Sequence, residues 1–333
     1  MATKVAVIGA GSWGTAVAAI ACRHADVVLW ARRADLAGEI ASTHVSGYLP
    51  GVQLPEALRA TASLEEALSG AEVVVMGVPS HGFRSVLAEA GALVPAGVPV
   101  ISLTKGVEQA TLKRMTQVVA DLLPNNPAGV LTGPNLAGEV LAGFPAASVV
   151  AIEDSHLAEE LQQLFATESF RVYTNPDVVG CEVAGALKNV MAIAAGMADG
   201  MGFGDNTKAA LMTRGLAELT RLGVALGGQP LTFSGLAGMG DLVATCMSRQ
   251  SRNRYVGEQL GKGRTLDEIV AQMNTVAEGV KTSRAVVDLA AQVGVEMPIA
   301  EQVVAVLYGG STAADAIPAL MLREAKPELH GLG

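Results

Sequence analysis

An apolar run at the start of the chain leads directly into a glycine-rich turn, and this junction restricts the fold more than any other stretch. In VAVIGAGSWGTAVA, Gly9, Gly11 and Gly14 have GxGxxG spacing between a predicted strand and a predicted apolar helix. Backbone amides at such a turn and helix N-terminus can closely approach the pyrophosphate of a dinucleotide. A purely structural turn is the alternative, because GxGxxG alone is a weak motif. Its place at the start of a βαβ unit favours dinucleotide binding.

Strand and helix patterns alternate through the first half of the chain. Short apolar β-rich runs end in turn residues, namely KVAVIGA, DVVLWAR, AEVVVMGVPS, VPVISLTKG and AGVLTGPN, and two further runs, AASVVAI and FRVYTN, are expected to complete the sheet. Helical patterns such as 64–68 and 83–92 lie between them. Near-continuous apolar strands that alternate with helices predict a parallel sheet covered on both faces.

From Val183 onward the sequence shows long helical patterns and no convincing strand. These patterns cover residues 183–199, 207–226, 252–260, 265–273, 279–293 and 299–308. The sequence therefore predicts an α/β fold, with a Rossmann-type doubly wound domain over residues 1–181 and an all-helical substrate domain over residues 182–333. A length of 333 residues suits about two domains.

Composition excludes several classes of function. A net charge of −9 argues against a general nucleic-acid binder. The histidines are scattered without metal-ligand spacing, and the three cysteines lie far apart, as in proteins of a reducing compartment. The N-terminus lacks an export signal, and no run of about 18 apolar residues occurs. We expect a cytoplasmic protein with no metal and no membrane span.

The end of the second predicted strand bears on the cofactor. An NAD-preferring site places an acidic residue there, whereas VVLWARRAD has Arg32 and Arg33, which could accept the 2′-phosphate of NADP(H). Arg33 could equally be an ordinary solvated arginine. We expect NADP(H) to be used at least as well as NAD(H).

Lys188 is an ammonium on a narrow helical face of small apolar residues. In EVAGALKNV and beyond, positions three and four residues away on either side are Ala184, Gly185, Met191 and Ala192. Most lysines on apolar helices lay the stem along the surface and lift the charge into water. The alternative is an acid–base group whose proton affinity is tuned by burial.

Other polar residues follow predicted strands or glycine turns. Lys105 follows VPVISLT and Gly133 follows GVLT, so both are expected beyond the carboxyl ends of parallel strands, where ligands bind; a loop lysine in water is the alternative for Lys105. Asp241 follows a glycine turn and could either cap a helix or orient Lys188 and the substrate hydroxyls.

Arginines concentrate in SRQSRNRYVG, at an expected helix start. A forked guanidinium beside helix-terminal amides can bind a phosphate, so Arg252 and Asn253 are assigned to the substrate phosphate. Arg249 and Arg254 are expected to lie on a solvated face.

Seven motifs in order along the whole chain give it a close resemblance to the bacterial-type NAD(P)-dependent glycerol-3-phosphate dehydrogenases. They are GAGSWGTA, LTKGVE, LTGPNLAGEV, EVAGALKNV, GLAGMGDLVATC, SRNRYVG and VAEGVKT. The resemblance implies reversible reduction of dihydroxyacetone phosphate to sn-glycerol 3-phosphate for phospholipid synthesis, with Lys188 as the proton-transfer residue. It implies a substrate group of Lys105, Gly133, Asn135, Lys188, Asp241, Ser251, Arg252 and Asn253. With the motifs above, it implies a cofactor group of Gly9, Gly11, Ser12, Trp13, Gly14, Arg32, Arg33, Lys105, Ala137, Arg252, Val276 and Glu278.

Two departures from the family pattern occur. The family commonly has GPSFA or GPTFA where this chain has Asn135 and Leu136, so a hydroxyl-specific role there is in doubt. Ala277 replaces a valine of VVEG.

Two other functions stay open. A dehydrogenase of the same build could act on a 3-hydroxy acid through a carboxylate clamp. A catalytically silent nucleotide sensor would keep the glycine turn but would have no reason to keep Lys188, Asp241, Arg252 and Asn253 together. The Ala/Gly-rich helical half could supply the face of a homodimer.

Overall fold

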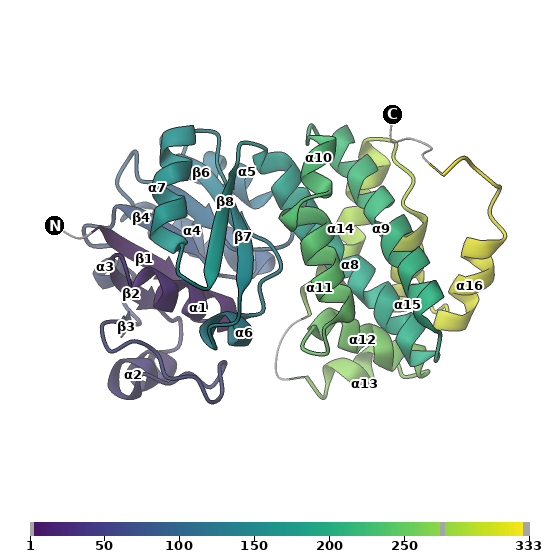
Figure 1. Cartoon of the computed structure of the whole chain (residues 1–333), viewed down its shortest axis with the longest axis horizontal. Coiled ribbons are helices and arrows are strands. Elements are labelled where there is room, and N and C mark those ends of the chain that lie inside the picture. The colour runs from purple at the N-terminus through teal and green to yellow at the C-terminus, as the bar shows by residue number, and fades with distance from the viewer. Residues whose placement is uncertain (1–2, 274–276, 329–333) are drawn as a thin grey trace. The chain divides into compact units, whose positions relative to one another are not determined.

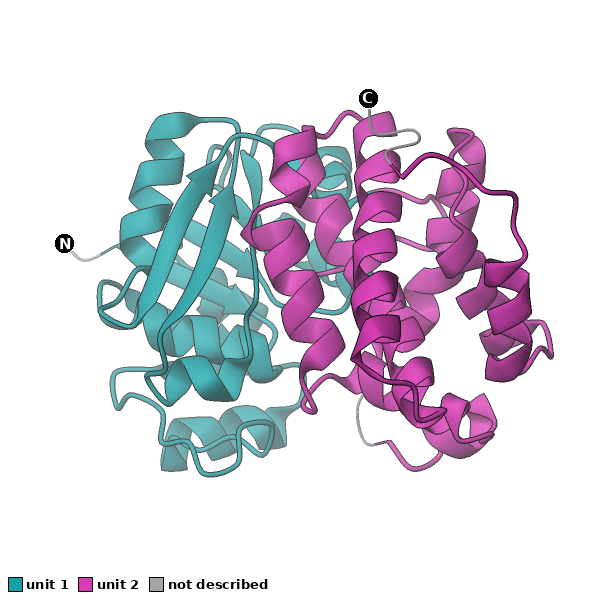
Figure 2. Cartoon of the chain, turned by 45° about the vertical axis from the view of Figure 1, so that its right-hand side comes forward, with its two compact units in different colours: residues 1–104, 114–178 teal, residues 105–113, 179–333 magenta. Residues whose placement is uncertain are grey.

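The computed structural model describes residues 3–273 and 277–328, and it divides into two compact units. Unit 1 comprises residues 1–104 and 114–178, and unit 2 comprises residues 105–113 and 179–333 (Figure 2). The short segment 105–113 therefore belongs to unit 2, although the strands on either side of it belong to unit 1.

Unit 1 is an eight-stranded sheet with the order β3-β2-β1-β4-β5-β6-β7-β8 (Figure 1). Its strands are β1 Lys4–Ile8, β2 Asp26–Trp30, β3 Arg59–Thr61, β4 Val73–Met76, β5 Val100–Ser102, β6 Ala128–Thr132, β7 Ala146–Ala151 and β8 Phe170–Asn175. Its helices are α1 Ser12–Ala21, α2 Ala34–Thr43, α3 Leu64–Leu68, α4 Ser80–Gly91, α5 Met115–Leu122, α6 Ala137–Leu141 and α7 Ser155–Phe165.

The sheet is covered on both faces, because neighbouring residues of each central strand enter different apolar cores. Val5 and Val7 of β1 pack in one core with Phe165 of α7. Ala6 and Ile8 pack in the other with Phe83 of α4. This alternation is the period of two expected of a strand buried on both sides. The predicted doubly wound α/β fold is confirmed.

One strand pairing differs from the expected parallel sheet. β7 pairs with β6 in the antiparallel sense, whereas the other pairings, including β7 with β8, are parallel. The apolar run AASVVAI carries no signal for the direction of its neighbour, because a strand buried on both faces looks alike in either orientation.

The secondary-structure elements in the described residues of unit 2 are helices, and residues 105–113 join them as a non-helical segment. The unit contains α8 Val178–Gly200, α9 Asp205–Ala225, α10 Pro230–Phe233, a π-helical turn η1 Leu236–Gly240, α11 Asp241–Met247, α12 Arg252–Gly261, α13 Leu266–Val270, α14 Glu278–Gln292, α15 Pro298–Tyr308 and α16 Ala313–Met321. α8 is long and apolar enough to cross a membrane, but 94% of its most apolar window is buried inside the protein. Its composition is therefore that of the core helix of this unit.

Glycines let α12 pack directly against the backbone of α8. A Cβ on Gly257 would lie 1.9 Å from the Ile193 carbonyl oxygen, and a Cβ on Gly196 would lie 2.0 Å from the Arg254 carbonyl oxygen. Because any side chain at these positions would clash with backbone, the contact needs glycine on both helices. The contact fixes the start of α12 beside α8.

Candidate active site

Lys188 lies on the buried core helix α8, and its side chain is only 7% exposed. Ala184 and Ala192 on the same face are fully buried. The ammonium donates hydrogen bonds to a carboxylate oxygen of Asp241 and, at 2.7 Å, to the Thr245 hydroxyl. The structure therefore excludes a lysine whose charge is lifted into water.

Asp241 joins two ammonium groups through its two carboxylate oxygens. Its Oδ1 accepts from Lys188 Nζ and its Oδ2 accepts from Lys105 Nζ at 2.7 Å. The residue opens α11 directly after the π-helical turn and is 1% exposed. Thr245, one turn later, donates to the Asp241 carbonyl at 2.6 Å. A buried carboxylate of this kind is stabilised only while its cationic partners remain in place.

Burial sets the proton affinity of Lys188. It lowers the pKa of the ammonium from 10.5 to about 8, with the nearby charge of Lys105 acting in the same direction and the Asp241 carboxylate opposing both. A lysine with a pKa near 8 can both give and take a proton close to neutral pH, as a general acid–base group must.

A line of amide hydrogen bonds holds the Lys105 segment against the helices. Asn189, next to Lys188 on α8, donates from its side chain to the Lys105 carbonyl at 3.1 Å. Its Oδ1 accepts from Asn253 Nδ2 at 2.9 Å, and Asn253 Oδ1 accepts from the Gly279 amide at 2.9 Å. Asn253, which the sequence assigns to the substrate phosphate, is buried and uses both ends of its amide within the protein.

The start of α12 carries two other predicted substrate residues, Ser251 and Arg252, of which Arg252 is assigned to the phosphate. Ser251 caps the helix by accepting from the Arg254 amide at 3.2 Å, and the Arg252 side chain is exposed. The prediction for Arg254 is wrong, because its side chain is 14% exposed and pairs with Asp199 at 2.7 Å. The close approach of α12 to α8 places this guanidinium beside an α8 carboxylate, which no local pattern indicates. Arg249 is exposed as expected.

In unit 1, each glycine of the predicted phosphate-binding turn has a different environment. A Cβ on Gly9, which has φ +123°, would lie 2.6 Å from the Gly77 carbonyl oxygen, and a Cβ on Gly14 would lie 2.0 Å from the Gly9 carbonyl oxygen. Gly11, the N-cap of α1, has no atom within 4 Å of such a Cβ. Two glycines thus allow the strand–helix packing, and the third leaves open space at the helix N-terminus, where a pyrophosphate fits.

Other predicted cofactor residues lie near the turn or at helix starts. The Ser12 hydroxyl donates to the Tyr48 carbonyl at 3.1 Å. Trp13 packs edge-on against Phe170 with ring centroids 6.1 Å apart, and its indole nitrogen is buried without a hydrogen-bond partner. Ala137 begins α6 and Glu278 begins α14, whereas Val276 lies outside the described residues.

Arg32 and Arg33 follow β2 and are exposed. Arg33 forms an ion pair with Asp35 at 3.5 Å, with side chains 58% and 75% exposed. Such a solvated pair is weak, so Arg33 can turn toward a ligand at little cost.

Gly133 and Asn135 follow β6. Gly133 has φ +143°, a conformation that favours glycine. The Asn135 amide donates to the Ser148 hydroxyl at 3.1 Å, while its oxygen is buried without a hydrogen-bond partner. Asn135 thus retains an acceptor for a ligand donor, but that acceptor is an amide oxygen rather than a hydroxyl.

Residues 3–273 and 277–328 contain no group of three His, Cys, Asp or Glu side chains placed to hold a metal ion.

Comparison with known proteins finds similarity along nearly the whole chain. The model of the NAD-dependent glycerol-3-phosphate dehydrogenase N-terminus matches residues 4–158, and that of the C-terminus matches residues 177–318. A glycerol-3-phosphate dehydrogenase [NAD(P)+] of Sphingopyxis alaskensis is 56% identical over 331 residues, covering 99% of each chain. The Mycobacterium avium enzyme of that name is 52% identical over 332 residues, covering 99% of this chain and 97% of that one. A crystal structure of glycerol-3-phosphate dehydrogenase from Coxiella burnetii superposes with a TM-score of 0.93 at 37% identity, covering 97% of this chain and 99% of that one.

Proposed function

Because this chain belongs to the NAD-dependent glycerol-3-phosphate dehydrogenase family, we propose that it catalyses the reversible NAD(P)H-dependent reduction of dihydroxyacetone phosphate to sn-glycerol 3-phosphate, which supplies glycerophospholipid synthesis. The observation that carries the proposal is the buried Lys188 ammonium, bound to Asp241 and with a pKa of about 8. A nucleotide sensor would have no use for this group.

Lys188 is the proton-transfer residue. In the reductive direction its ammonium donates a proton to the carbonyl oxygen of the substrate, and in the oxidative direction the neutral amine accepts the hydroxyl proton. The bound nicotinamide supplies or accepts the hydride at the carbon. Asp241 favours the charged ammonium between turnovers, while burial and, as a smaller cause, the Lys105 ammonium on the other carboxylate oxygen lower the pKa of Lys188 toward neutrality.

The substrate phosphate binds at the start of α12. Arg252 is exposed there and can form a bidentate contact, while the helix terminus and Ser251 contribute hydrogen-bond donors. Asn253 supports this position through its bonds to Asn189 and Gly279 as well as by contact with the ligand. Gly133 and Asn135 are assigned to the substrate from the family resemblance.

The dinucleotide binds at the glycine turn. Gly11 leaves space for the pyrophosphate, and Arg32 and Arg33 are placed to accept a 2′-phosphate. The remaining residues assigned to this group are Gly9, Ser12, Trp13, Gly14, Lys105, Ala137, Arg252, Val276 and Glu278.

The test is the loss of NADPH absorbance with purified protein and dihydroxyacetone phosphate. Lys188→Met should still bind NADPH, but its turnover should fall at least about 100-fold, which is the lower end of what a positioned acid–base group contributes. Lys262→Met is the matched control, because Lys262 is 49% exposed and pairs with Glu258 in the same unit. Near-normal turnover in Lys188→Met would refute the role of this lysine. Turnover of a 3-hydroxy acid in place of dihydroxyacetone phosphate would favour the alternative dehydrogenase.

The surroundings of the enzyme are a further part of the proposal. The three free cysteines favour a reducing compartment, and we place the enzyme in the cytoplasm. Its substrates are small molecules. Its assembly is a homodimer formed through the Ala/Gly-rich helical unit.

A further inference from the structure

One loop of the helical unit carries the second cation that binds Asp241. Residues 105–113 form this docking loop, which begins with Lys105, and the Lys105 ammonium contacts the Asp241 carboxylate at 2.7 Å. The hydrogen bond from Asn189 to the Lys105 carbonyl holds the start of the loop. Two further contacts hold the rest of it against the helices.

Gln109 attaches the docking loop to α14. Its side-chain amide donates to the Lys281 carbonyl at 2.7 Å. α14 is in turn joined to α12 and α8, because the Gly279 amide donates to Asn253 and the Asn253 side chain donates to Asn189. Since the same α8 asparagine also holds the start of the loop, these hydrogen bonds and the backbone between them form a closed ring. Gln109 is the side chain that closes this ring.

Leu112 occupies an unfavourable backbone conformation near the end of the docking loop. Its φ is +58°, in the left-handed region that leucine rarely adopts. The turn is closed by hydrogen bonds from the Leu112 amide to the Glu108 carbonyl at 2.8 Å and from the Glu108 amide to the Lys113 carbonyl at 2.9 Å. In this conformation the leucine side chain packs against the apolar core of the helical unit. Strained residues of this kind persist where their surroundings compensate for the strain, and they cluster at functional sites.

The position of the docking loop bears on the proton-transfer residue. Asp241 and Lys105 act on the Lys188 ammonium in opposite senses, since the carboxylate raises its pKa and the second ammonium lowers it. The Cys246 thiol beside them stays neutral, because burial raises its pKa to about 12. Movement of the loop away from the helices would take the Lys105 ammonium from Asp241. The pKa of Lys188 would then rise.

We propose that Gln109 and Leu112 are positioning residues of the reaction, which fasten the docking loop to the helical unit and so keep the Lys105 ammonium on the Asp241 carboxylate. Neither residue belongs to the substrate or cofactor group that the family resemblance implies. The inference rests on the proposed function and deepens it by naming two residues that act through Lys105.

Steady-state kinetics on the full chain test the role of Gln109. Gln109→Met keeps the length of the side chain but removes the donor, and it should raise the KM for dihydroxyacetone phosphate roughly two- to tenfold, the effect of one ordinary hydrogen bond. It should also move the pH profile of kcat to higher pH, which a loss of stability alone would not do. Gln292→Met is the matched control, because Gln292 is an exposed glutamine at the other end of α14. Its KM and pH profile should match the wild type.

Two substitutions test the packing of Leu112. Leu112→Ala removes the side chain that packs on the helical core, and should change KM and the pH profile in the same senses as Gln109→Met. Leu112→Met keeps an apolar side chain of similar volume and should restore wild-type kinetics. Both variants are compared at a temperature at which circular dichroism shows them to be folded.

A double-mutant cycle with Lys105→Met decides whether the two residues act through Lys105. Once this ammonium is absent, adding Gln109→Met should change KM and the pH profile no further. Additive effects, an unmoved pH profile in Gln109→Met, or altered kinetics in Leu112→Met would overturn the proposal.

A measurement without turnover separates this inference from the proposed function. The rate at which acetic anhydride acetylates Lys188, followed against pH by peptide mass spectrometry, reports the pKa of this lysine. That pKa should rise in Gln109→Met and stay unchanged in Gln292→Met. An unchanged pKa in Gln109→Met would refute the positioning role, whereas a wild type that does not reduce dihydroxyacetone phosphate would refute the proposed function.

Discussion

Replacing the Asp241 carboxylate by its isosteric amide is expected to move the pH profile of the enzyme to lower pH in both directions, and to change the two rates at neutral pH in opposite senses. Asp241→Asn retains the shape of the side chain but removes the charge that opposes deprotonation of Lys188. A hydrogen bond between charged groups contributes about 1.5–3 kcal/mol net, and one pKa unit corresponds to about 1.4 kcal/mol. The pKa of Lys188 should therefore fall roughly one to two units below its wild-type value of about 8.

The protonated fraction of Lys188 follows from this shift. Near neutral pH most of the wild-type lysine is charged, whereas the variant should retain roughly two- to tenfold less of the charged form. Protonation alone should therefore slow reduction of dihydroxyacetone phosphate by that factor. The same substitution should raise the fraction of Lys188 that is present as the neutral amine, the form needed for oxidation of glycerol 3-phosphate.

The assay is kcat against pH in both directions, for wild type and variant. Ionisation of the substrate phosphate is common to both enzymes and cancels in the comparison. Asp199→Asn is the control, because Asp199 lies on α8 like Lys188, but its carboxylate pairs with Arg254 of α12. It should lower stability and leave the pH profile in place. A profile in Asp241→Asn that stays in place, or moves to higher pH, would refute the electrostatic account of Lys188.

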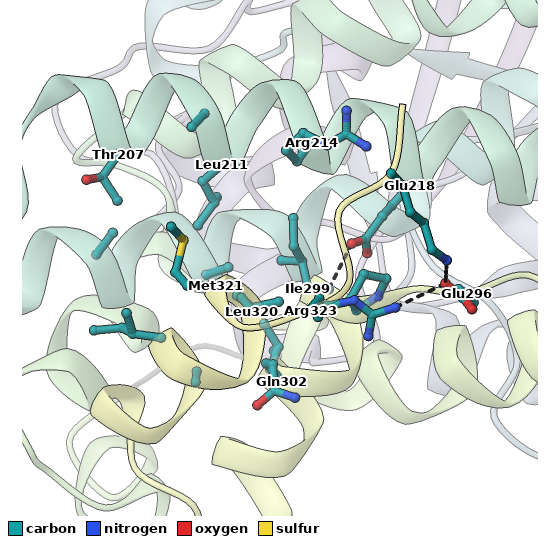
Figure 3. A pocket seen from close by; sticks show the side chains of 18 of the residues that line it. Thr207, Leu211, Arg214, Glu218, Glu296, Ile299, Gln302, Leu320, Met321 and Arg323 are labelled. Atoms are coloured by element: carbon teal, nitrogen blue, oxygen red, sulfur yellow. Dashed lines mark hydrogen bonds and ion pairs between the residues drawn. The ribbon is translucent and has the colours of Figure 1, made fainter. Parts of the chain in front are cut away.

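Further predictions concern the cofactor, a buried carboxyl and a helix contact. Arg32→Ala should raise the KM for NADPH about tenfold or more and leave that for NADH unchanged; an equal loss for both would mean that Arg32 does not bind the 2′-phosphate. Burial raises the pKa of Glu218 on α9 (Figure 3) from 4.5 to about 7. Between these two pH values the folded state binds more protons than the unfolded state, so the free energy of unfolding should fall as pH rises through this range. Glu218→Gln should remove this pH dependence of the free energy of unfolding, measured by urea unfolding. If the free energy changed with pH as steeply in the variant as in the wild type, the raised pKa of Glu218 would be contradicted. Gly257→Ala should lower the free energy of unfolding by about 1–3 kcal/mol or more, because its methyl would meet the Ile193 carbonyl. The exposed Gly38→Ala, with no atom within reach, should be neutral or stabilising.

Much of the fold could be predicted because its signals are local. The strand–turn–helix at Gly9 to Gly14, the apolar strands and the switch to helices near residue 180 all follow from patterns within a few neighbouring residues. The three-residue β3 is too short for such a pattern. The antiparallel β6–β7 pairing also has no local signal, because strand direction depends on the path of the connection.

The site could be predicted only as far as residue types and motifs allow. Lys188 was recognisable because small residues surround it in sequence as well as in space. Thr245 was missed, although it lies one helical turn from Asp241, where its hydroxyl reaches both the Asp241 carbonyl and the Lys188 ammonium. The grouping of residues 105–113 with unit 2 could not be predicted from periodicity, since it reflects contacts with residues distant in sequence. Among them are the hydrogen bond from Asn189 to the Lys105 carbonyl and the packing of Val107 in the helical core.

The Gly-rich composition of the helical unit and the position of the buried lysine are both connected to the close packing of α8 against α12. Because Gly196 and Gly257 let α8 and α12 meet backbone to backbone, Asn253 reaches Asn189 across the contact. Asn189 in turn holds the carbonyl of Lys105, whose ammonium completes the pair on Asp241. The backbone-to-backbone contact of α8 with α12 thus fixes the position of Lys105, the second cation bound to Asp241. The clash introduced by Gly257→Ala should consequently lower turnover together with stability, since it separates the two asparagines on which the position of Lys105 depends.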